Sequence, residues 1–166
     1  MASERFVDAL NAQIGREFAA AHQYVAIGVY YAGETFPQLA AFFYDQADEE
    51  RDHAMKMVNH LLDRDVRPEI GAVDGPRGDF ADHVEPIRVA LEQEREVTVR
   101  ISELFEIARE TRDYQSEQFI HWFLEEQVEE EAAMTDLLAV AERTRMVPML
   151  LEEYLARETP GNTTGD

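Results

Sequence analysis

Apolar residues recur at spacings of three and four along four stretches of the chain. These stretches cover about residues 3–34, 37–65, 82–112 and 113–143. That spacing places the apolar side chains on one face of a helix, so each stretch predicts a helix with one buried side. Four helices of this kind would bury their apolar faces against one another. The pattern therefore predicts an all-α fold built on a four-helix bundle.

Capping residues and helix breakers mark the ends of these stretches. Ser3 and Asp113 are suited to cap the first and fourth helices, because their side-chain oxygens accept hydrogen bonds from free backbone N–H groups. Thr35 or Pro37 is suited to open the second helix. Pro86 falls within about the first turn of the third helix, where a proline is tolerated.

A long connection separates the second helix from the third. Residues 66–81 are rich in proline and glycine and are long enough to span a whole helix, so they can cross over and leave these two helices parallel. Residues 149–157 predict a short fifth helix after Pro148. We expect residues 1–158 to form one domain, and residues 159–166 to be a disordered polar tail.

Each predicted helix has a line of residues, three or four apart, that a bundle would bury. In the first helix this line reads Leu10, Ile14, Glu17, Ala21, Tyr24, Gly28 and Tyr31. In the second it reads Leu39, Phe43, Gln46, Glu50, His53, Met57 and His60. In the third it reads Ile87, Ala90, Glu94, Val97, Ile101, Leu104 and Ala108. In the fourth it reads Ile120, Phe123, Gln127, Glu130, Met134, Leu137 and Ala141.

Every line carries a glutamate within its length, namely Glu17, Glu50, Glu94 and Glu130. A buried carboxylate is costly unless it is paired, protonated or bound to a metal, and several at one level repel each other without cations between them. The lines contain no lysine or arginine, and only His53 is level with the acids. Two divalent metal ions held by these side chains would neutralise the charge.

Other interpretations of the same residues remain open. Glu50 and His53 are three residues apart, a spacing that is equally typical of a pair on a helix surface. The four acids could also form a hydrogen-bonded polar layer without metal. Tyr24 could serve only for packing, and the acids just outside the lines could form a solvated surface.

Composition narrows the class of function. The formal net charge is −20, with 35 acidic and 15 basic side chains, which disfavours nucleic-acid binding. Such a charge either keeps the surface solvated or concentrates cations. The chain has no cysteine, so thiolate metal sites and disulfides are excluded. We find no apolar run of membrane-spanning length and expect a cytoplasmic protein that does not bind membranes.

Two motifs resemble those of one known family. The run A-D-E-E-R-D-H-A at residues 47–54 looks like the second-helix motif of non-haem bacterial ferritins, which are ferritin-like di-iron carboxylate proteins. The run W-F-L-E-E-Q-V-E-E-E at residues 122–131 is similar to their fourth-helix motif. The resemblance covers about residues 4–157, including the crossover and the short fifth helix. It implies the ferritin-like four-helix bundle, in which facing helices hold a di-iron carboxylate site.

The resemblance also implies roles for individual residues. Glu17, Glu50 and His53 would bind a first iron ion. Glu50 would bridge to a second iron ion, which Glu94 and Glu130 complete.

Three further groups of residues are implied at or near this centre. Gln127 would sit beside the two irons and orient oxygen, and Tyr24 would lie next to the ligands as an electron donor and hydrogen-bond partner. A third, looser iron site would share Glu130 and use three more acids, namely Glu49, Glu126 and Glu129.

The implied activity is that of a ferroxidase with an iron store. Fe(II) would be oxidised by O₂ or peroxide and kept as ferric oxo-hydroxide mineral inside a homo-oligomeric shell of 24 subunits. The fifth helix would pack at four-fold contacts of that shell. Acidic pores would admit Fe(II), with Asp113, Glu117 and His121 as candidate pore residues.

Two departures from related patterns matter. Arg51 stands where bacterioferritins place a haem-ligating methionine, so we expect no haem. The second Glu-x-x-His of the general di-iron pattern is replaced here by Gln127 and Glu130.

Three alternatives to a ferroxidase shell remain: a storage shell without its own oxidase site, a di-metal oxidoreductase of the rubrerythrin or oxygenase type, and a purely structural four-helix module.

Overall fold

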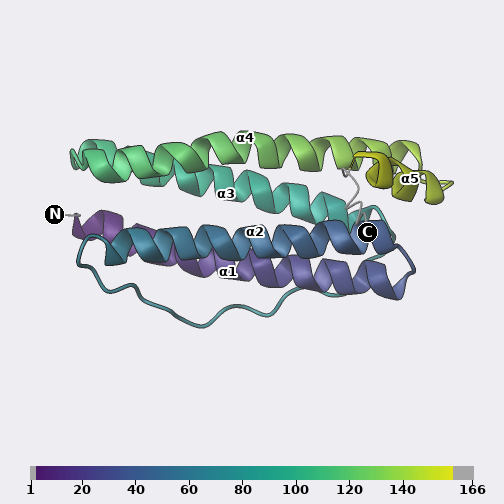
Figure 1. Cartoon of the computed structure of the whole chain (residues 1–166), viewed down its shortest axis with the longest axis horizontal. Coiled ribbons are helices and arrows are strands. Elements are labelled where there is room, and N and C mark those ends of the chain that lie inside the picture. The colour runs from purple at the N-terminus through teal and green to yellow at the C-terminus, as the bar shows by residue number, and fades with distance from the viewer. Residues whose placement is uncertain (1–2, 159–166) are drawn as a thin grey trace, which may run out of the picture.

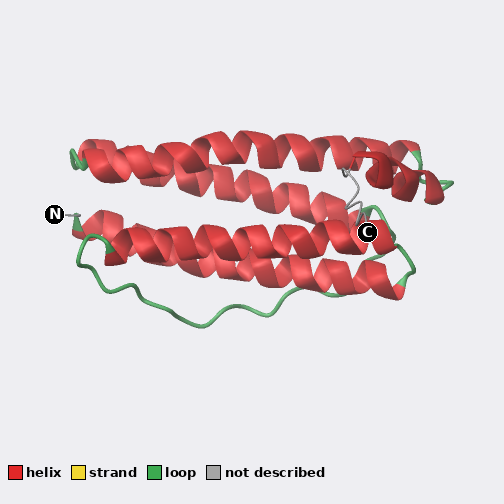
Figure 2. Cartoon of the chain, in the orientation of Figure 1, coloured by secondary structure: helices red, strands yellow, loops and turns green. Residues whose placement is uncertain are grey.

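The computed structural model describes residues 3–158, and within that range it contains five helices and no strand (Figures 1 and 2). The helices are α1 (Glu4–Gly33), α2 (Pro37–Leu62), α3 (Glu85–Glu110), α4 (Tyr114–Arg143) and α5 (Met149–Glu158). The first four form a bundle, and α5 lies across one end of it. The predicted all-α fold is therefore confirmed. The predicted tail, residues 159–166, lies outside the described residues.

The connection between α2 and α3 runs the full length of the bundle (Figure 1). It leaves the end of α2 and returns the chain to the opposite end, where α3 begins. As a result α2 and α3 point the same way, while α1 with α2 and α3 with α4 form antiparallel pairs. The predicted crossover is confirmed.

The predicted caps are present at α1 and α4. The hydroxyl oxygen of Ser3 accepts a hydrogen bond from the backbone N–H of Phe6 at 3.2 Å. The Asp113 carboxylate accepts one from the N–H of Ser116, also at 3.2 Å. Each bond satisfies an N–H group that the first helical turn leaves without a backbone partner.

Two helix ends differ from the sequence prediction, and a third decides between two predicted residues. α2 ends at Leu62 because the chain turns there, and Asp65 has a φ of 61°, which is incompatible with a continuing helix. α3 begins at Glu85, after Asp82, whose carboxylate accepts hydrogen bonds from backbone N–H groups of the first turn. Thr35 has a φ of 65°, so α2 is opened by Pro37 and not by Thr35.

The interior consists of two apolar clusters. One fills the end that holds the start of α1, and its members include Phe6, Leu10, Ile14, Met57, Leu61, Ile101, Ile120 and Phe123. The other fills the end near α5, and its members include Tyr24, Ile27, Tyr31, Leu39, Phe43, Ile87, Met134, Leu137 and Leu151. A layer of buried polar side chains lies between the two clusters.

No described helix combines the length and apolar character that crossing a membrane requires.

The four predicted lines of buried residues are observed almost without exception. Only Ala21 and His60 are half-buried among their members. On α1 the neighbouring Ala20 is buried in place of Ala21. On α2 the His60 ring stacks on Phe119 near the helix end, with ring centroids 3.9 Å apart. Helical periodicity therefore predicts the buried faces well in the middle of the bundle and less well at its edges.

Candidate metal site

The polar layer between the two clusters contains six side chains contributed by the four bundle helices. None is more than 5% exposed, and they are Glu17, Glu50, His53, Glu94, Gln127 and Glu130. Each helix contributes at least one, because the predicted lines bring their acids to the same height. The predicted convergence of these residues in the interior is therefore observed.

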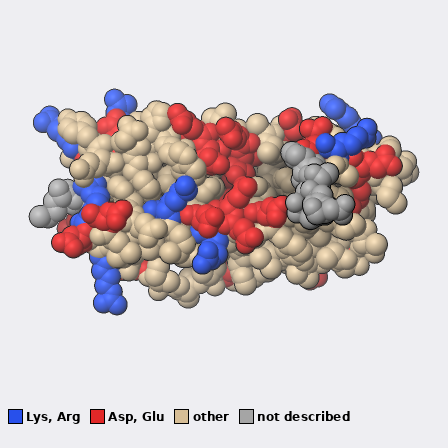
Figure 3. Space-filling view, in the orientation of Figure 1, with Lys and Arg blue, Asp and Glu red and all other residues tan. Residues whose placement is uncertain are grey.

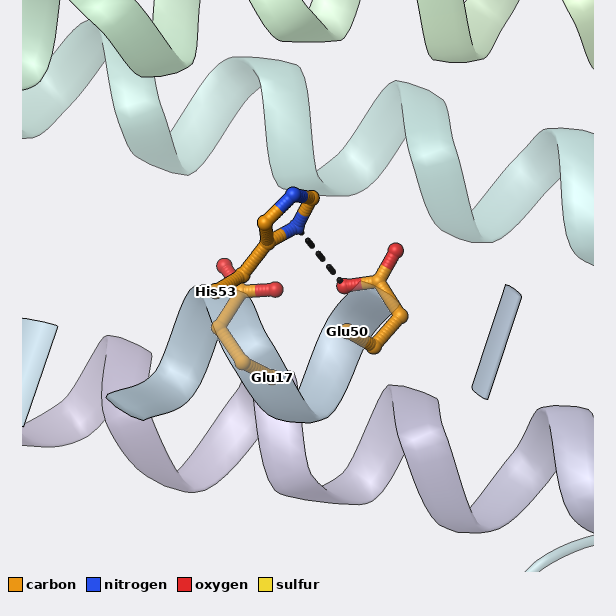
Figure 4. A group of neighbouring side chains, drawn as sticks. All are labelled: Glu17, Glu50 and His53. Atoms are coloured by element: carbon orange, nitrogen blue, oxygen red, sulfur yellow. Dashed lines mark ion pairs between the residues drawn. The ribbon is translucent and has the colours of Figure 1, made fainter. Parts of the chain in front are cut away.

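The side chains of Glu17, Glu50 and His53 lie close together (Figure 4). Each offers one ligand atom, and these three atoms lie within 4.8 Å of one another. Nδ1 of His53 lies 3.5 Å from Oε2 of Glu50. Oε2 of Glu17 is buried and accepts no hydrogen bond, and the same is true of Oε2 of Glu50. Unpartnered buried carboxylate oxygens are costly, and they are the atoms that a hard metal ion would bind.

Glu94 is held from two other helices. The hydroxyl of Tyr24 on α1 donates a hydrogen bond to its Oε1. The Gln127 amide on α4 donates to Oε2 of Glu94 at 3.2 Å and also lies 3.2 Å from the Glu94 backbone carbonyl. A third contact, 3.3 Å long, joins the same amide to the Thr98 hydroxyl. Tyr24 and Gln127 therefore fix Glu94, and Thr98 is a supporting residue that the sequence prediction did not include.

A second cluster lies on the α4 side of the same histidine. Ligand atoms of His53, Glu126 and Glu130 also lie within 4.8 Å of one another. The Glu126 side chain is half-buried, whereas Glu49 and Glu129 are exposed. Among the predicted residues of a third site, only Glu126 is thus brought into such a cluster with Glu130.

The acids of the layer raise one another's pKa values. Burial, and then the Glu50 charge, raises the pKa of Glu17 well above its usual range. Burial raises the pKa of Glu50 in the same way, with Glu94 as the next cause. The pKa of Glu94 is raised by burial, although the hydrogen bonds from Tyr24 and Gln127 oppose the shift. Burial, followed by the charge of Glu94, raises the pKa of Glu130 to about 8.

Acidic side chains gather midway along the face on which α2 and α4 are seen (Figure 3). Glu126 on α4 and Glu49 on α2 lie near the buried layer, because the charges of both act on the Glu130 carboxylate. The Trp122 ring, which is partly exposed, meets the buried His53 ring edge-on, with centroids 5.6 Å apart. The buried acids therefore lie directly beneath an acidic surface that attracts cations.

One candidate pore residue has a different role. Asp113 is only 8% exposed, and both of its carboxylate oxygens lie 2.8 Å from one guanidinium nitrogen of Arg64. Arg64 and the cap to Ser116 hold the pKa of Asp113 below its usual range, although burial opposes this shift. Asp113 is therefore part of the α3–α4 corner and is not available to line a pore, whereas Glu117 and His121 are more exposed.

The chain is similar to known ferritins along most of its length. A family model described as a ferritin-like domain matches residues 7–144. Ferritin BfrB of Mycobacterium tuberculosis (strain Erdman) is 49% identical over 154 residues, which are 93% of this chain and 85% of that protein. Bacterial non-heme ferritin of Staphylococcus aureus (strain MRSA252) is 45% identical over 132 residues, 80% of each protein. The crystal structure of an open pore ferritin from Archaeoglobus fulgidus superposes with a TM-score of 0.90 at 30% identity, covering 94% of this chain and 98% of the other.

Proposed function

Because this chain belongs to the ferritin family, we propose that it oxidises Fe(II) at the buried carboxylate layer and stores the product as ferric oxo-hydroxide. Iron is the substrate and the cargo of this reaction. The proposal has three parts, which are an oxidase site for two iron ions per subunit, a nearby acidic surface, and a closed shell of 24 subunits.

One observation carries the proposal. Four glutamates, each at most 5% exposed, meet between two apolar clusters together with His53. Among the described residues, none of the four pairs with a lysine or arginine side chain. Such a layer is unfavourable when its acids are ionised. Two divalent cations would supply the missing positive charge, whereas a structural module would have apolar residues at these positions.

We assign the two iron ions to distinct sets of side chains. Glu17, Glu50 and His53 bind the first ion, and their mutual proximity supports this assignment. Glu50 also binds the second ion, together with Glu94 and Glu130. Each Fe(II) gives one electron to O₂ or peroxide, and a shared carboxylate ligand keeps the two ions close enough to react with a single oxidant molecule.

Tyr24 and Gln127 act on this centre through Glu94. By donating to the two oxygens of Glu94 they fix the direction of its carboxylate and favour its ionised form. We also propose that the Gln127 amide orients the oxidant and that Tyr24 supplies an electron. The hydrogen bonds of both residues to Glu94 support these roles.

The acidic surface over the layer supplies a third, weaker iron site in this proposal. Glu126 and Glu130 of α4 would hold that ion together with two exposed acids, Glu49 of α2 and Glu129 of α4. A partly exposed cluster binds cations more weakly than a fully buried one, because water screens its charge. Such a site would pass iron between the buried centre and the growing mineral.

Exposed apolar residues support the shell. Between α4 and α5 the side chain of Met146 is 90% exposed, and on α5 Met149 is 66% exposed. Large apolar side chains gathered at one end of a subunit are typical of surfaces that other subunits cover. We propose that α5 and this turn form the four-fold contacts of the shell. The cytoplasmic location stays a prediction from the sequence.

The assembly is tested by measuring the mass of the purified protein and its iron uptake together. A shell of 24 chains of 19.1 kDa should scatter light as a particle of about 460 kDa. It should oxidise two Fe(II) ions per chain quickly and then load mineral. A monomer or simple dimer in mild buffer would contradict the shell. A shell that fills with iron only slowly, without a fast first phase, would instead identify a container that lacks an oxidase site.

A further inference from the structure

Gln13 lies one helical turn before Glu17 on α1 and is completely buried. Its amide nitrogen donates a hydrogen bond to Oε1 of Glu17 at 2.7 Å. This donor lowers the pKa of Glu17, opposing the larger effects of burial and of Glu50. Gln13 is thus a neutral side chain in direct contact with a carboxylate of the layer.

The other end of the same amide contacts Arg16. Oε1 of Gln13 accepts a hydrogen bond from the Arg16 guanidinium at 3.4 Å. A guanidinium can only donate, and a carboxylate that binds a metal ion is ionised and can only accept. The two neighbours therefore require the same orientation of the amide, with its oxygen toward Arg16 and its NH₂ group toward Glu17.

This arrangement makes the two oxygens of Glu17 unequal. Oε1 is occupied by Gln13, while Oε2 is buried without a partner. A ligand atom from each of Glu17, Glu50 and His53 lies within the same 4.8 Å cluster. An amide fixed at one oxygen limits the rotation of the carboxylate, so the other oxygen stays available to a metal ion.

We propose that Gln13 is a positioning residue for the first iron ion, because it orients Glu17 and keeps one of its oxygens free for the metal. This inference rests on the proposed function, since it assigns a purpose to Glu17 that only a metal site requires. Partners that orient a metal ligand commonly change metal affinity by about 10–100-fold when they are removed.

The choice of variant follows from the surroundings of Gln13. It borders a cavity of about 150 Å³ whose other walls include Ala9, Leu104 and Ile107. Gln13→Ala would enlarge that cavity toward the layer and admit water. Gln13→Leu instead keeps most of the volume and removes only the amide. Gln13→Glu keeps the shape but replaces the donor with a second acceptor beside Glu17.

Gln23→Leu is the matched control. Gln23 is on the same helix, and its amide bonds both the carbonyl and the N–H of Arg77 in the crossover, at 2.8 and 2.9 Å. The control therefore makes the same substitution and loses tertiary hydrogen bonds, but it does not touch the layer. Any effect of losing a glutamine as such appears in both variants.

The test is an oxygen-free titration of the assembled protein with Co(II), followed by the absorption of the bound ion. The first Co(II) should bind about tenfold or more weakly to Gln13→Leu, and more weakly still to Gln13→Glu, while Gln23→Leu matches the parent. Equal Co(II) affinity in the parent and both Gln13 variants would overturn the inference and leave Gln13 a purely structural residue. If Gln13→Leu does not assemble, Gln13→Glu decides the question by the same criterion.

The two proposals fail in different ways. A parent that binds Co(II) at the layer but shows no fast Fe(II) oxidation would sink the oxidase proposal and leave the Gln13 comparison valid. If the parent oxidises Fe(II) fast but the Gln13 variants bind Co(II) as tightly as the parent, the oxidase proposal stands and the proposed role of Gln13 fails.

Discussion

The carboxylate of Glu152, in α5, accepts a hydrogen bond from the backbone N–H of Leu39, in the first turn of α2, at 2.9 Å. Its second oxygen accepts one from the N–H of Gln38 at 2.8 Å. The N-cap residue of α2, Phe36, has no side-chain acceptor for these groups. A buried side chain from the far end of the sequence therefore caps α2, and it also places a negative charge at the positive end of that helix.

Glu152→Ala should destabilise the protein and loosen α5. The loss of both cap bonds leaves two backbone N–H groups of α2 without acceptors, so we expect the free energy of unfolding to fall by about 1–2 kcal/mol. Denaturant unfolding measures this change. Glu153→Ala is the control, because Glu153 is exposed and lies next in the chain. Equal losses in the two variants would show that the cap contributes nothing.

Tyr24→Phe should weaken the metal centre without disturbing the core. The phenylalanine ring can keep the packing against Phe43, but Oε1 of Glu94 loses its donor. Since that donor lowers the pKa of Glu94, its loss should raise the pKa and move metal binding to higher pH.

Tyr31→Phe is the matched control for Tyr24→Phe, because the Tyr31 hydroxyl donates to the backbone carbonyl of His83, away from the layer. Stopped-flow measurement of Fe(II) oxidation compares the two variants, and only Tyr24→Phe should be slower than the parent. Equal rates in all three proteins would contradict the role of Tyr24.

The metal-free protein should lose stability as the pH rises. The pKa of Glu130 is raised from 4.5 to about 8 by burial and by Glu94, so the folded chain binds protons that the unfolded chain has already released. The free energy of unfolding should therefore fall as the pH rises from about 4.5 to about 8. Divalent metal should reverse the fall, because it binds the ionised carboxylates.

Thermal unfolding of metal-free parent and Glu130→Gln at a series of pH values measures this effect. The variant should lose less stability across the window, because its amide does not titrate. His60 and His83 have pKa values lowered by burial and act in the opposite direction, but they are common to both proteins. Parallel curves for the two proteins would mean that Glu130 does not titrate in this range.

We expect that the protein does not bind haem as bacterioferritins do, because Arg51 stands where they have a haem-ligating methionine. Its side chain is 64% exposed and lies 3.9 Å from Asp52, and a guanidinium does not ligate haem iron. Protein produced with ample haem should show no stoichiometric Soret band. A bis-methionine haem spectrum would contradict this and would point to Met55, the nearest methionine on α2.

Much of the fold and of the layer could be predicted from helical periodicity. The spacing of apolar residues alone places Glu17, Glu50, Glu94 and Glu130 at buried positions, because a helix repeats its faces regularly. The crossover follows from the length and composition of one loop.

Other features depend on contacts between distant segments and could not be predicted this way. In the sequence, Glu152 is one of several acids on a short predicted helix. Only the packing of α5 against α2 shows that it caps α2. The sequence predicts Asp113 both as a helix cap and as a pore residue, and the contact with Arg64 decides between these roles. Gln13 was missed although a signal was present, since a polar residue one turn before Glu17 shares its face.

The most direct test of the oxidase site is the initial rate of Fe(II) oxidation at two iron ions per chain in the parent and in Glu50→Ala. The variant removes the ligand shared by both ions, and removal of a buried carboxylate should leave the metal-free fold intact or more stable. Glu96→Ala, on an exposed face of α3, is the control. The account predicts that the fast phase disappears in Glu50→Ala alone, while particle size and slow mineral growth persist. A Glu50→Ala shell that oxidises its first two irons per chain as fast as the parent would contradict it.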